Sequence, residues 1–416
     1  MGRRWPIGCV ALEITQRCNL DCGACYLSEN SEVVKDLPLE EVFHRIDRIR
    51  LHYGRETDVQ VTGGDPTLRK RSELIAIVRR IRTLGMRPAL FTNGIRATRE
   101  LLQELAEAGL VDVAFHVDMT QGRRGYGSEE ALDELRAEYI ARTRGLKLAV
   151  YFNTTVFDGN LADVPALAGF FARNSDVVRL ASFQILADVG RGDLRRRGVV
   201  ITPDAVCERI REGIGTSLTF DALQPGHARC NRYAAGLVAN GSIYDLLDDK
   251  RLVSQVLSRS ARVQFDRQNR RRVLASVAGW LMRNPDMLPP IAGWIIRKAW
   301  AARDDLWRAR GRVNKLSFFV HNFMDACRLE PDRIDACAFT VATDEGPISM
   351  CLHNAKRDAF ILKPLRVDAA DPTRYWNPLS GAYGAEAPRV DGQSGTVTQR
   401  RKRRPNVASV LGAAAE

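Results

Sequence analysis

Short apolar runs alternate with segments of helical periodicity over the first half of the chain. The apolar runs, which predict buried strands, lie at Cys9–Thr15, Asp58–Thr62, Pro88–Thr92, Val111–Val117, Lys147–Thr155 and Val178–Leu186. The periodic segments, which predict helices, lie at Pro38–Leu51, Leu74–Leu84, Arg99–Ala108, Glu129–Arg144, Val164–Arg173 and Pro203–Glu212. Strict alternation favours a parallel sheet, and right-handed crossovers would curl it. The sequence therefore predicts an α/β fold with a partial, TIM-like (β/α)6 barrel.

Polar motifs follow the ends of the first four predicted strands. In barrel-like sheets the chemistry collects at the carboxyl ends of the strands. The motifs there are, in chain order, a cysteine loop, Gly63-Gly64-Asp65-Pro66, Asn93-Gly94, and His116 with Asp118. We therefore expect one functional site at this edge of the sheet.

The cysteine loop holds Cys18, Cys22 and Cys25 within the stretch TQRCNLDCGACY. Thiols this close suit a metal centre better than disulfides, which join distant elements. Three thiolates can hold three irons of a [4Fe–4S] cube and leave the fourth iron open. Zinc is the alternative, but a closed zinc site needs a fourth ligand, and no further Cys or His lies nearby in the sequence.

The CxxxCxxC spacing, with Tyr26 directly after the last cysteine, resembles the signature of the radical S-adenosylmethionine (radical SAM) superfamily. The resemblance implies that Cys18, Cys22 and Cys25 hold a catalytic [4Fe–4S] cluster whose open iron binds SAM. It further implies that the reduced cluster splits SAM into methionine and a 5′-deoxyadenosyl radical, which abstracts hydrogen from a substrate. An external electron donor of the flavodoxin or ferredoxin type is then expected.

Other positions resemble SAM-binding positions of that superfamily. Gly63-Gly64-Asp65-Pro66 resembles a Gly-Gly-Glu-Pro motif whose backbone and carboxylate hold the SAM amino group, although Asp65 is one methylene shorter than the glutamate. A plain turn at a strand end is the alternative. Asn153 falls where a polar group often lies near the SAM ribose. The remaining candidates for cofactor binding are Tyr26, Asn93 and Asp118, and Asn93 could also serve only as a turn residue.

A second set of cysteines follows the predicted barrel: Cys230, Cys327, Cys337 and Cys351. The stretch FTVATDEGPISM predicts a β-hairpin that would bring Cys337 close to Cys351. Four thiolates could close an auxiliary [4Fe–4S] cluster, with zinc as the less favoured metal. The alternative is separate buried thiols, and His353 is a rival ligand. Cys9 and Cys207 are expected to be small buried hydrophobic residues.

The resemblance narrows to one radical SAM subgroup, which contains the archaeal tetraether lipid synthases and the class D methyltransferases acting on pterins. The stretches that carry it are Ser182–Gln184, Arg191–Asp204, Phe323–Ala326, Arg333–Cys337 and Ala342–Gly346. Those synthases contain more cysteines and an N-terminal metal-binding extension. This chain has thiols for only one auxiliary site, so we expect fewer electron-relay centres.

The segment Lys250–Lys315 contains 16 Lys and Arg against four Asp, and therefore holds the whole net charge of +12. It also contains Trp280, Trp294, Trp300 and Trp307. We expect a helical hairpin broken at Asn284–Pro290. No uncharged run approaches the ~20 residues of a membrane span. Helices with tryptophans opposite arginines fit a membrane interface, so peripheral membrane contact through 250–315 is predicted. A lid over the barrel is the alternative, and nucleic acid is an unlikely partner.

These patterns divide the chain into five parts: 1–215, the radical SAM partial barrel; 216–249, the first part of an auxiliary-site region; 250–315, the insert; 316–365, the C-terminal auxiliary-cluster region; and 366–416, a mostly disordered basic tail with the run Gln399–Pro405. No secretory signal pattern precedes the first strand, and grouped thiols fit a reducing compartment. We expect a cytoplasmic protein, with peripheral attachment to the inner face of the membrane as a further option.

Three hypotheses of function follow. The first is a radical SAM enzyme that abstracts hydrogen from an unactivated sp3 carbon for C–C bond formation on a lipid or other hydrophobic substrate. The second is a radical SAM C-methyltransferase acting on a pterin-like or other small molecule. The third is a non-enzymatic, basic Fe–S binding protein.

Overall fold

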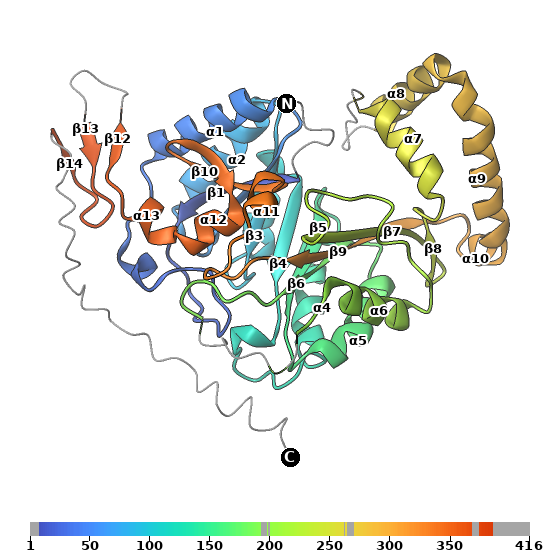
Figure 1. The fold of residues 1–416 in the computed structure, drawn as a ribbon, viewed down its shortest axis with the longest axis horizontal. Coiled ribbons are helices and arrows are strands. Elements are labelled where there is room, and N and C mark those ends of the chain that lie inside the picture. The colour runs from blue at the N-terminus through green and yellow to red at the C-terminus, as the bar shows by residue number, and fades with distance from the viewer. Residues whose placement is uncertain are drawn as a thin grey trace.

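The structure, a computed structural model, describes residues 8–192, 198, 200–261, 263, 270–367 and 374–385. Within these residues, one 11-stranded sheet has the order β11-β10-β1-β2-β3-β4-β5-β6-β9-β7-β8 (Figure 1). This linear order ends at β11 and β8, so the described sheet is open. The predicted α/β fold is confirmed, and an open sheet is compatible with a partial barrel.

The centre of the sheet is built by six parallel strands that follow chain order. They are β1 (Cys9–Thr15), β2 (Asp58–Gly63), β3 (Arg87–Thr92), β4 (Asp112–His116), β5 (Ala149–Val156) and β6 (Val178–Ile185). The crossovers contain α1 (Leu39–Tyr53), α2 (Arg71–Thr83), α3 (Arg99–Glu107), α4 (Leu132–Thr143) and α5 (Val164–Arg173). After β6 comes α6 (Pro203–Ile214), which Thr202 caps by accepting from the Ala205 N–H.

Helix α4 begins three residues later than the predicted start at Glu129. The Glu129 carboxylate is buried in an ion pair with Arg136, and it also accepts from the Met119 N–H at 3.0 Å. These contacts hold the turn that follows β4, so Glu129 belongs to the site edge of the sheet and not to the helix.

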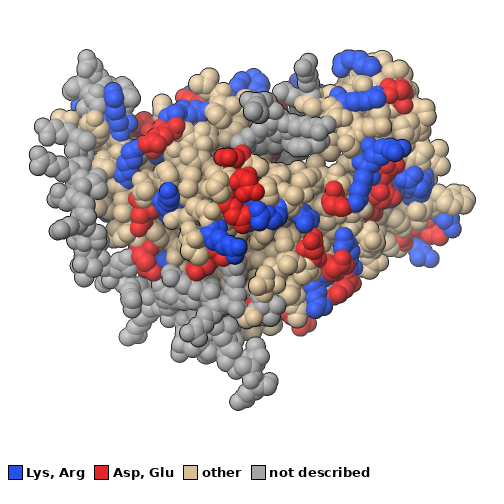
Figure 2. Space-filling view, in the orientation of Figure 1, with Lys and Arg blue, Asp and Glu red and all other residues tan. Residues whose placement is uncertain are grey.

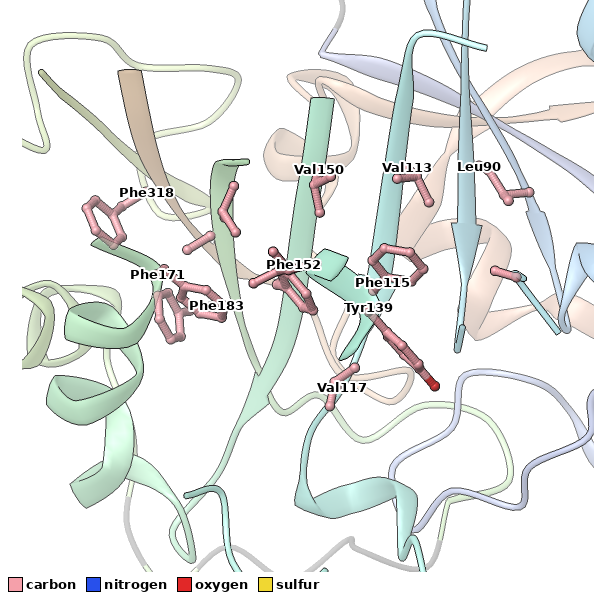
Figure 3. Close-up of a cluster of buried hydrophobic side chains, with 14 of the residues drawn as sticks. Leu90, Val113, Phe115, Val117, Tyr139, Val150, Phe152, Phe171, Phe183 and Phe318 are labelled. Carbon is pink, nitrogen blue, oxygen red and sulfur yellow. The ribbon is translucent and has the colours of Figure 1, made fainter. Parts of the chain in front are cut away.

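The hydrophobic core lies between the central strands and their helices. Figure 3 shows Phe115, Phe152 and Phe183 from neighbouring strands packing with Phe171 of α5. The Phe152 and Phe171 rings are stacked with centroids 5.4 Å apart. Such aromatic contacts stabilise a core beyond their buried area. They fix the strands whose carboxyl ends carry the site.

The C-terminal segments extend this sheet at both sides. Strand β9 (Asn314–Asn322) pairs parallel with β6, and β7 (Asn231–Ala239) pairs antiparallel with β9 and with β8 (Ser242–Asp245). At the other side, β10 (Phe339–Thr343) pairs parallel with β1 and antiparallel with β11 (Gly346–Ser349). The predicted hairpin is confirmed, while the joining of β9 and β10 to the central sheet was not predicted.

The insert forms α7 (Lys250–Ser260), α8 (Arg270–Arg283), α9 (Leu288–Ala301) and α10 (Arg303–Arg308), which stand at one side of the sheet (Figure 1). The predicted break Asn284–Pro290 is shorter in the structure, since α9 already begins at Leu288. Its prolines occupy the first helical turn, where no N–H partner is needed. Trp280 is buried with Leu252 and Met287 in a small core of the insert.

The remaining elements lie near the C-terminus: α11 (Pro331–Asp335), α12 (Met350–Ala355), α13 (Arg357–Ile361), and a three-stranded sheet of β12 (Leu365–Val367), β13 (Arg374–Trp376) and β14 (Tyr383–Gly384). Short 3-10 turns are η1 (Glu29–Val33), η2 (Pro66–Leu68), η3 (Met119–Gln121), η4 (Leu161–Asp163) and η5 (Pro285–Met287). Two strands thus occur within 366–416, which was expected to be mostly disordered. The basic run 399–405 and part of the stretch 191–204 lie outside the described residues.

Candidate functional site

The cysteine loop crosses the carboxyl end of the sheet between β1 and η1. Cys18, Cys22 and Cys25 are all half-buried, and none of the three forms a disulfide bond. The Gly23 N–H donates to the Thr120 carbonyl at 2.6 Å, which ties the loop to the turn after β4. The Tyr26 hydroxyl donates to the Gly63 carbonyl, which ties it to the end of β2. The loop is therefore fixed at both sides by the neighbouring strand ends.

The three thiols lie close enough to influence one another. Burial, followed by the Cys25 and Cys18 thiolates, raises the pKa of Cys22 well above its usual value. A bound metal overcomes such a cost because it deprotonates the thiols that ligate it. No three His, Cys, Asp or Glu side chains of the described residues are grouped so as to hold a single metal ion. The all-sulfur donor set on one short loop fits an iron–sulfur cluster, in which each thiolate binds its own iron.

Gly63 and Gly64 are packed against the start of the cysteine loop. A Cβ on Gly63 would lie 2.0 Å from the Thr15 carbonyl oxygen, and one on Gly64 would lie 1.9 Å from the Arg17 carbonyl oxygen. The Gly64 N–H donates to Thr15 at 2.9 Å. Sequence reasoning assigned these glycines to a close approach of the cofactor. The structure shows a close approach to the loop that carries Cys18, which only glycine permits.

Both carboxylate oxygens of Asp65 are engaged by the protein. Oδ1 accepts from the N–H and the hydroxyl of Thr67 at 3.0 and 2.5 Å, and Oδ2 accepts from the Thr92 hydroxyl and the Asn93 N–H, both at 2.8 Å. The residue is 1% exposed. These four bonds use the acceptor sites of a carboxylate. Asp65 joins the ends of β2 and β3, and its contact with SAM stays a prediction.

Asn93 contacts the cysteine loop directly. Its Nδ2 donates to the Asn19 side chain at 2.7 Å and lies 3.9 Å from the Cys18 sulfur. Its carbonyl accepts from Arg123 at 2.5 Å and from the Tyr139 hydroxyl at 3.2 Å. Asn93 is therefore a residue of the site edge and does more than close a turn.

Asp118 is fully buried beside His116. Its Oδ2 lies 2.6 Å from His116 Nε2 and accepts from the Thr155 N–H at 2.7 Å, while Oδ1 accepts from Thr120. Burial opposes ionisation, but His116 and these hydrogen bonds hold the pKa of Asp118 at about 2. The carboxylate is thus a permanent anion that joins the ends of β4 and β5.

Asn153 lies opposite His116 in the ladder between β4 and β5. The residue is buried, and its side-chain amide makes no hydrogen bond to any described residue. An amide with unused donors and acceptors at this edge of the sheet is suited to hydrogen-bond a ligand. Its placement agrees with the predicted role near the SAM ribose, which stays a prediction.

Three arginines of the site were missed by sequence reasoning: Arg123, Arg191 and Arg357. Arg123 donates to the Asn93 carbonyl and lowers the pKa of Cys22 against the larger effect of burial. Arg357 lies over the Tyr26 ring at 4.7 Å. Single arginines carry no periodic or spacing signal, and only the fold brings these side chains to the cysteine loop.

The second cysteine set is partly brought together. Cys337 precedes β10, and Cys351 lies in the first turn of α12. Cys337 raises the pKa of Cys230 and of Cys351, and Cys230 also raises that of Cys351, in each case after the larger effect of burial. Cys230 accepts a hydrogen bond from Arg333 Nε at 3.2 Å. Cys327 is exposed. Cys230, Cys337 and Cys351 therefore form one thiol group, whereas Cys9 and Cys207 are buried, as predicted.

Comparison with known proteins identifies the class of one part of the chain. Residues 12–167 match the family described as the Radical SAM superfamily. This part of the chain, from β1 to α5, is thus a radical SAM domain, which implies a [4Fe–4S] cluster and SAM. The match contains the cysteine loop and the edge formed by Gly63, Asp65, Asn93, Asp118 and Asn153.

Individual relatives cover only part of the chain. The 7,8-dihydro-6-hydroxymethylpterin dimethyltransferase of Methanocaldococcus jannaschii is 28% identical over 203 residues, which are 47% of this chain and 40% of that protein. The Fe-coproporphyrin III synthase of Methanosarcina barkeri is 30% identical over 187 residues, 44% of this chain and 45% of that protein. Streptococcus suis SuiB bound to the precursor peptide SuiA aligns with a TM-score of 0.40 at 15% identity over 51% of this chain and 46% of that one. The chain spans less than half the length of each.

Proposed function

We propose that this protein is a radical SAM enzyme that reductively cleaves SAM and abstracts hydrogen from an unactivated sp3 carbon, leading to C–C bond formation on a lipid or other hydrophobic substrate. The observation that carries the enzyme class is the loop of Cys18, Cys22 and Cys25, fixed against the ends of β2 and β4. When bound, the cluster would supply the electron that cleaves SAM.

The chain's own residues would bind the cluster, orient SAM and shield the radical from water. Cys18, Cys22 and Cys25 would hold three irons. The carbonyls at Gly63–Asp65 and the free amide of Asn153 would orient SAM, while the Gly64 and Asp65 N–H groups donate to the carbonyls of Thr15 and Arg17. Asp118 and Asp65, which organise the ends of β2 to β5, would keep these groups in place. The surrounding sheet would exclude water from a reactive radical, which is the usual contribution of a protein to such chemistry.

Spectroscopy of the cluster tests this class. The protein, reconstituted anaerobically with iron and sulfide, is expected to bind about four irons at the loop. Reduced protein should show an electron paramagnetic resonance (EPR) signal that changes when SAM is added, because SAM would bind the open iron. An unchanged signal at saturating SAM would contradict the assignment. The second thiol group must be removed in this experiment by the C230A/C337A/C351A variant, so that only one cluster is observed.

We further propose an auxiliary [4Fe–4S] cluster at Cys230, Cys337 and Cys351. Cys327 would be the fourth ligand, because its loop already contacts the group: the Met324 N–H lies 3.5 Å from the Cys351 sulfur. Iron and zinc analysis of the C18A/C22A/C25A variant tests this. Bound zinc in place of iron would contradict the proposed iron–sulfur cluster, but it would still support a metal site at these cysteines.

The insert supports a hydrophobic substrate at a membrane surface. Trp300 and Trp307 are 70% and 86% exposed, and Ile296 and Met282 are also exposed. Figure 2 shows Lys and Arg side chains on the insert, with acidic ones between them. The described residues contain no helix long and apolar enough to cross a membrane. Exposed tryptophans among cations fit the interface of an anionic bilayer, where peripheral attachment at the inner face would occur.

Vesicle flotation tests the membrane proposal. The chain should float with vesicles containing phosphatidylglycerol and should not float with phosphatidylcholine alone. W300S/W307S should lose this binding. Leu51 of α1 is equally exposed, at 87%, so L51S is the matched control and should bind normally. Absence of binding to anionic vesicles would remove the support for a lipid substrate.

A radical SAM C-methyltransferase acting on a pterin-like substrate is the second candidate, and the likeness to the pterin dimethyltransferase favours it. The insert would then serve as a lid. This candidate predicts turnover of a reduced pterin without vesicles. A non-enzymatic basic Fe–S protein predicts no SAM cleavage at all.

A further inference from the structure

The segment Gly190-Arg191-Gly192 lies directly on the cysteine loop. A Cβ on Gly190 would lie 2.4 Å from the Cys25 carbonyl oxygen, and one on Gly192 would lie 2.6 Å from the Gly23 carbonyl oxygen. The Arg191 N–H donates to the Leu27 carbonyl at 2.7 Å. The two glycines permit this approach because they have no side chain. Arg191 is thereby fixed beside the part of the loop that carries Cys25.

The Arg191 side chain is buried, at 5% exposed, and part of its hydrogen-bonding capacity is unused. Nη1 donates to Glu32 Oε1 at 2.8 Å. Nε and Nη2, which share one edge of the guanidinium, are buried and donate to no described residue. Such an edge recognises anionic acceptors through two parallel N–H bonds, and buried N–H groups are rarely left without a partner. The edge therefore indicates an anionic group that would accept from it.

The charges around Arg191 indicate which anion this is. Burial would lower the pKa of Arg191, but the Cys25 thiolate, ahead of Glu32, raises it. Glu32 already accepts from Nη1. Asp21 also raises the pKa of Arg191, by less than Cys25 or Glu32, so the strongest negative charge acting on the guanidinium is that of Cys25 and whatever this thiolate binds.

We propose that Arg191 is a positioning residue of the cluster: its Nε–Nη2 edge donates to the sulfurs of the iron–sulfur cluster held by the cysteine loop and stabilises the reduced form. This inference rests on the proposed function. The cluster gains one electron from the external donor, which is oxidised, and no covalent bond changes. Reduction adds a negative charge, so hydrogen bonds to sulfur and a fixed, buried cation favour the reduced form.

The test is the midpoint potential of the full-length, reconstituted protein, measured by EPR-monitored redox titration in the C230A/C337A/C351A background. R191Q should lower the equilibrium constant for reduction of the cluster at least tenfold. For a one-electron couple this lowers the midpoint potential by about 59 mV. R191K keeps the charge but lacks the planar edge, so its midpoint potential should lie between those of the wild type and R191Q. R17Q is the control. Arg17 directly precedes Cys18 but is exposed and paired with Asp36, so solvent screens its charge and the shift should be smaller.

Equal midpoints for the wild type and R191Q would overturn the inference. If R191Q takes up no cluster, R191K decides: a midpoint below that of the wild type supports the inference, and an equal one overturns it. Iron and sulfide analysis separates this result from a failure of the proposed function. A wild-type chain that binds no cluster would refute both, whereas a loaded wild type with the midpoint of R191Q would refute only the role of Arg191.

Discussion

Arg357 donates to both carboxylate oxygens of Glu13, at 2.8 and 2.9 Å, across 344 residues of sequence. Both side chains are buried. Burial would raise the pKa of Glu13, but Arg357 overcomes it and holds the pKa at about 2. The pair joins α13 to the end of β1, where the cysteine loop begins, and Arg357 also covers Tyr26. The C-terminal region is thereby coupled to the candidate site.

Breaking this pair should destabilise the apoprotein strongly. R357M leaves a buried, unpaired carboxylate and should lower the free energy of unfolding by about 3–5 kcal/mol. E13Q/R357M should be less affected than R357M, since no buried charge remains. R209M removes an exposed ion pair with Glu212 and should cost about 0–1 kcal/mol. Urea unfolding measures all three, and a cost for R357M as small as that for R209M would contradict the coupling.

Gly64 should tolerate no side chain. In G64A the new Cβ would meet the Arg17 carbonyl oxygen at 1.9 Å, so the start of the cysteine loop must move. We expect most of the iron uptake to be lost. Gly127, where a Cβ meets nothing within 4 Å, gives the matched control G127A, which should load normally. Equal iron content in the two variants would show that the contact is unimportant.

Substitution of Asp65 distinguishes a structural role of its carboxylate from direct binding of SAM. D65N replaces one acceptor oxygen by an NH2 group that faces donors, which should cost about 1–3 kcal/mol of stability even without cofactor. Thermal unfolding of the apoprotein measures this cost, and SAM titration of the loaded protein measures affinity. Unchanged stability together with weaker SAM binding would instead assign Asp65 to the cofactor.

His321 should make the stability of the apoprotein depend on pH. Burial lowers the pKa of His321 to about 3, so the ring stays neutral in β9. Below about pH 6.5, the ordinary pKa, the unfolded chain binds a proton that the folded chain does not, and stability falls as pH falls toward 3. This amounts to about 2 kcal/mol between pH 6.5 and 5. In urea unfolding, H321Q should lose less stability than the wild type over this interval. An identical loss would exclude His321 as the cause of the pH dependence.

The sequence predicted the elements whose signals are local. The apolar runs of β1 to β6 and the hairpin of β10 and β11 needed only periodicity and turn residues. It did not predict that β9 and β10 join the central sheet, because strand partners far apart in sequence leave no local pattern. The same reason hid Arg191 and Arg357. Trp280 was expected at a surface, but the packing of α7 against α8 buries it.

The central claim is that the cysteine loop supports reductive cleavage of SAM. The most direct measurement is 5′-deoxyadenosine formed from SAM by the reconstituted protein under dithionite, without oxygen, with C22A as the control. The account predicts deoxyadenosine from the wild type and none from C22A. A fully loaded wild-type cluster that forms no deoxyadenosine would contradict it.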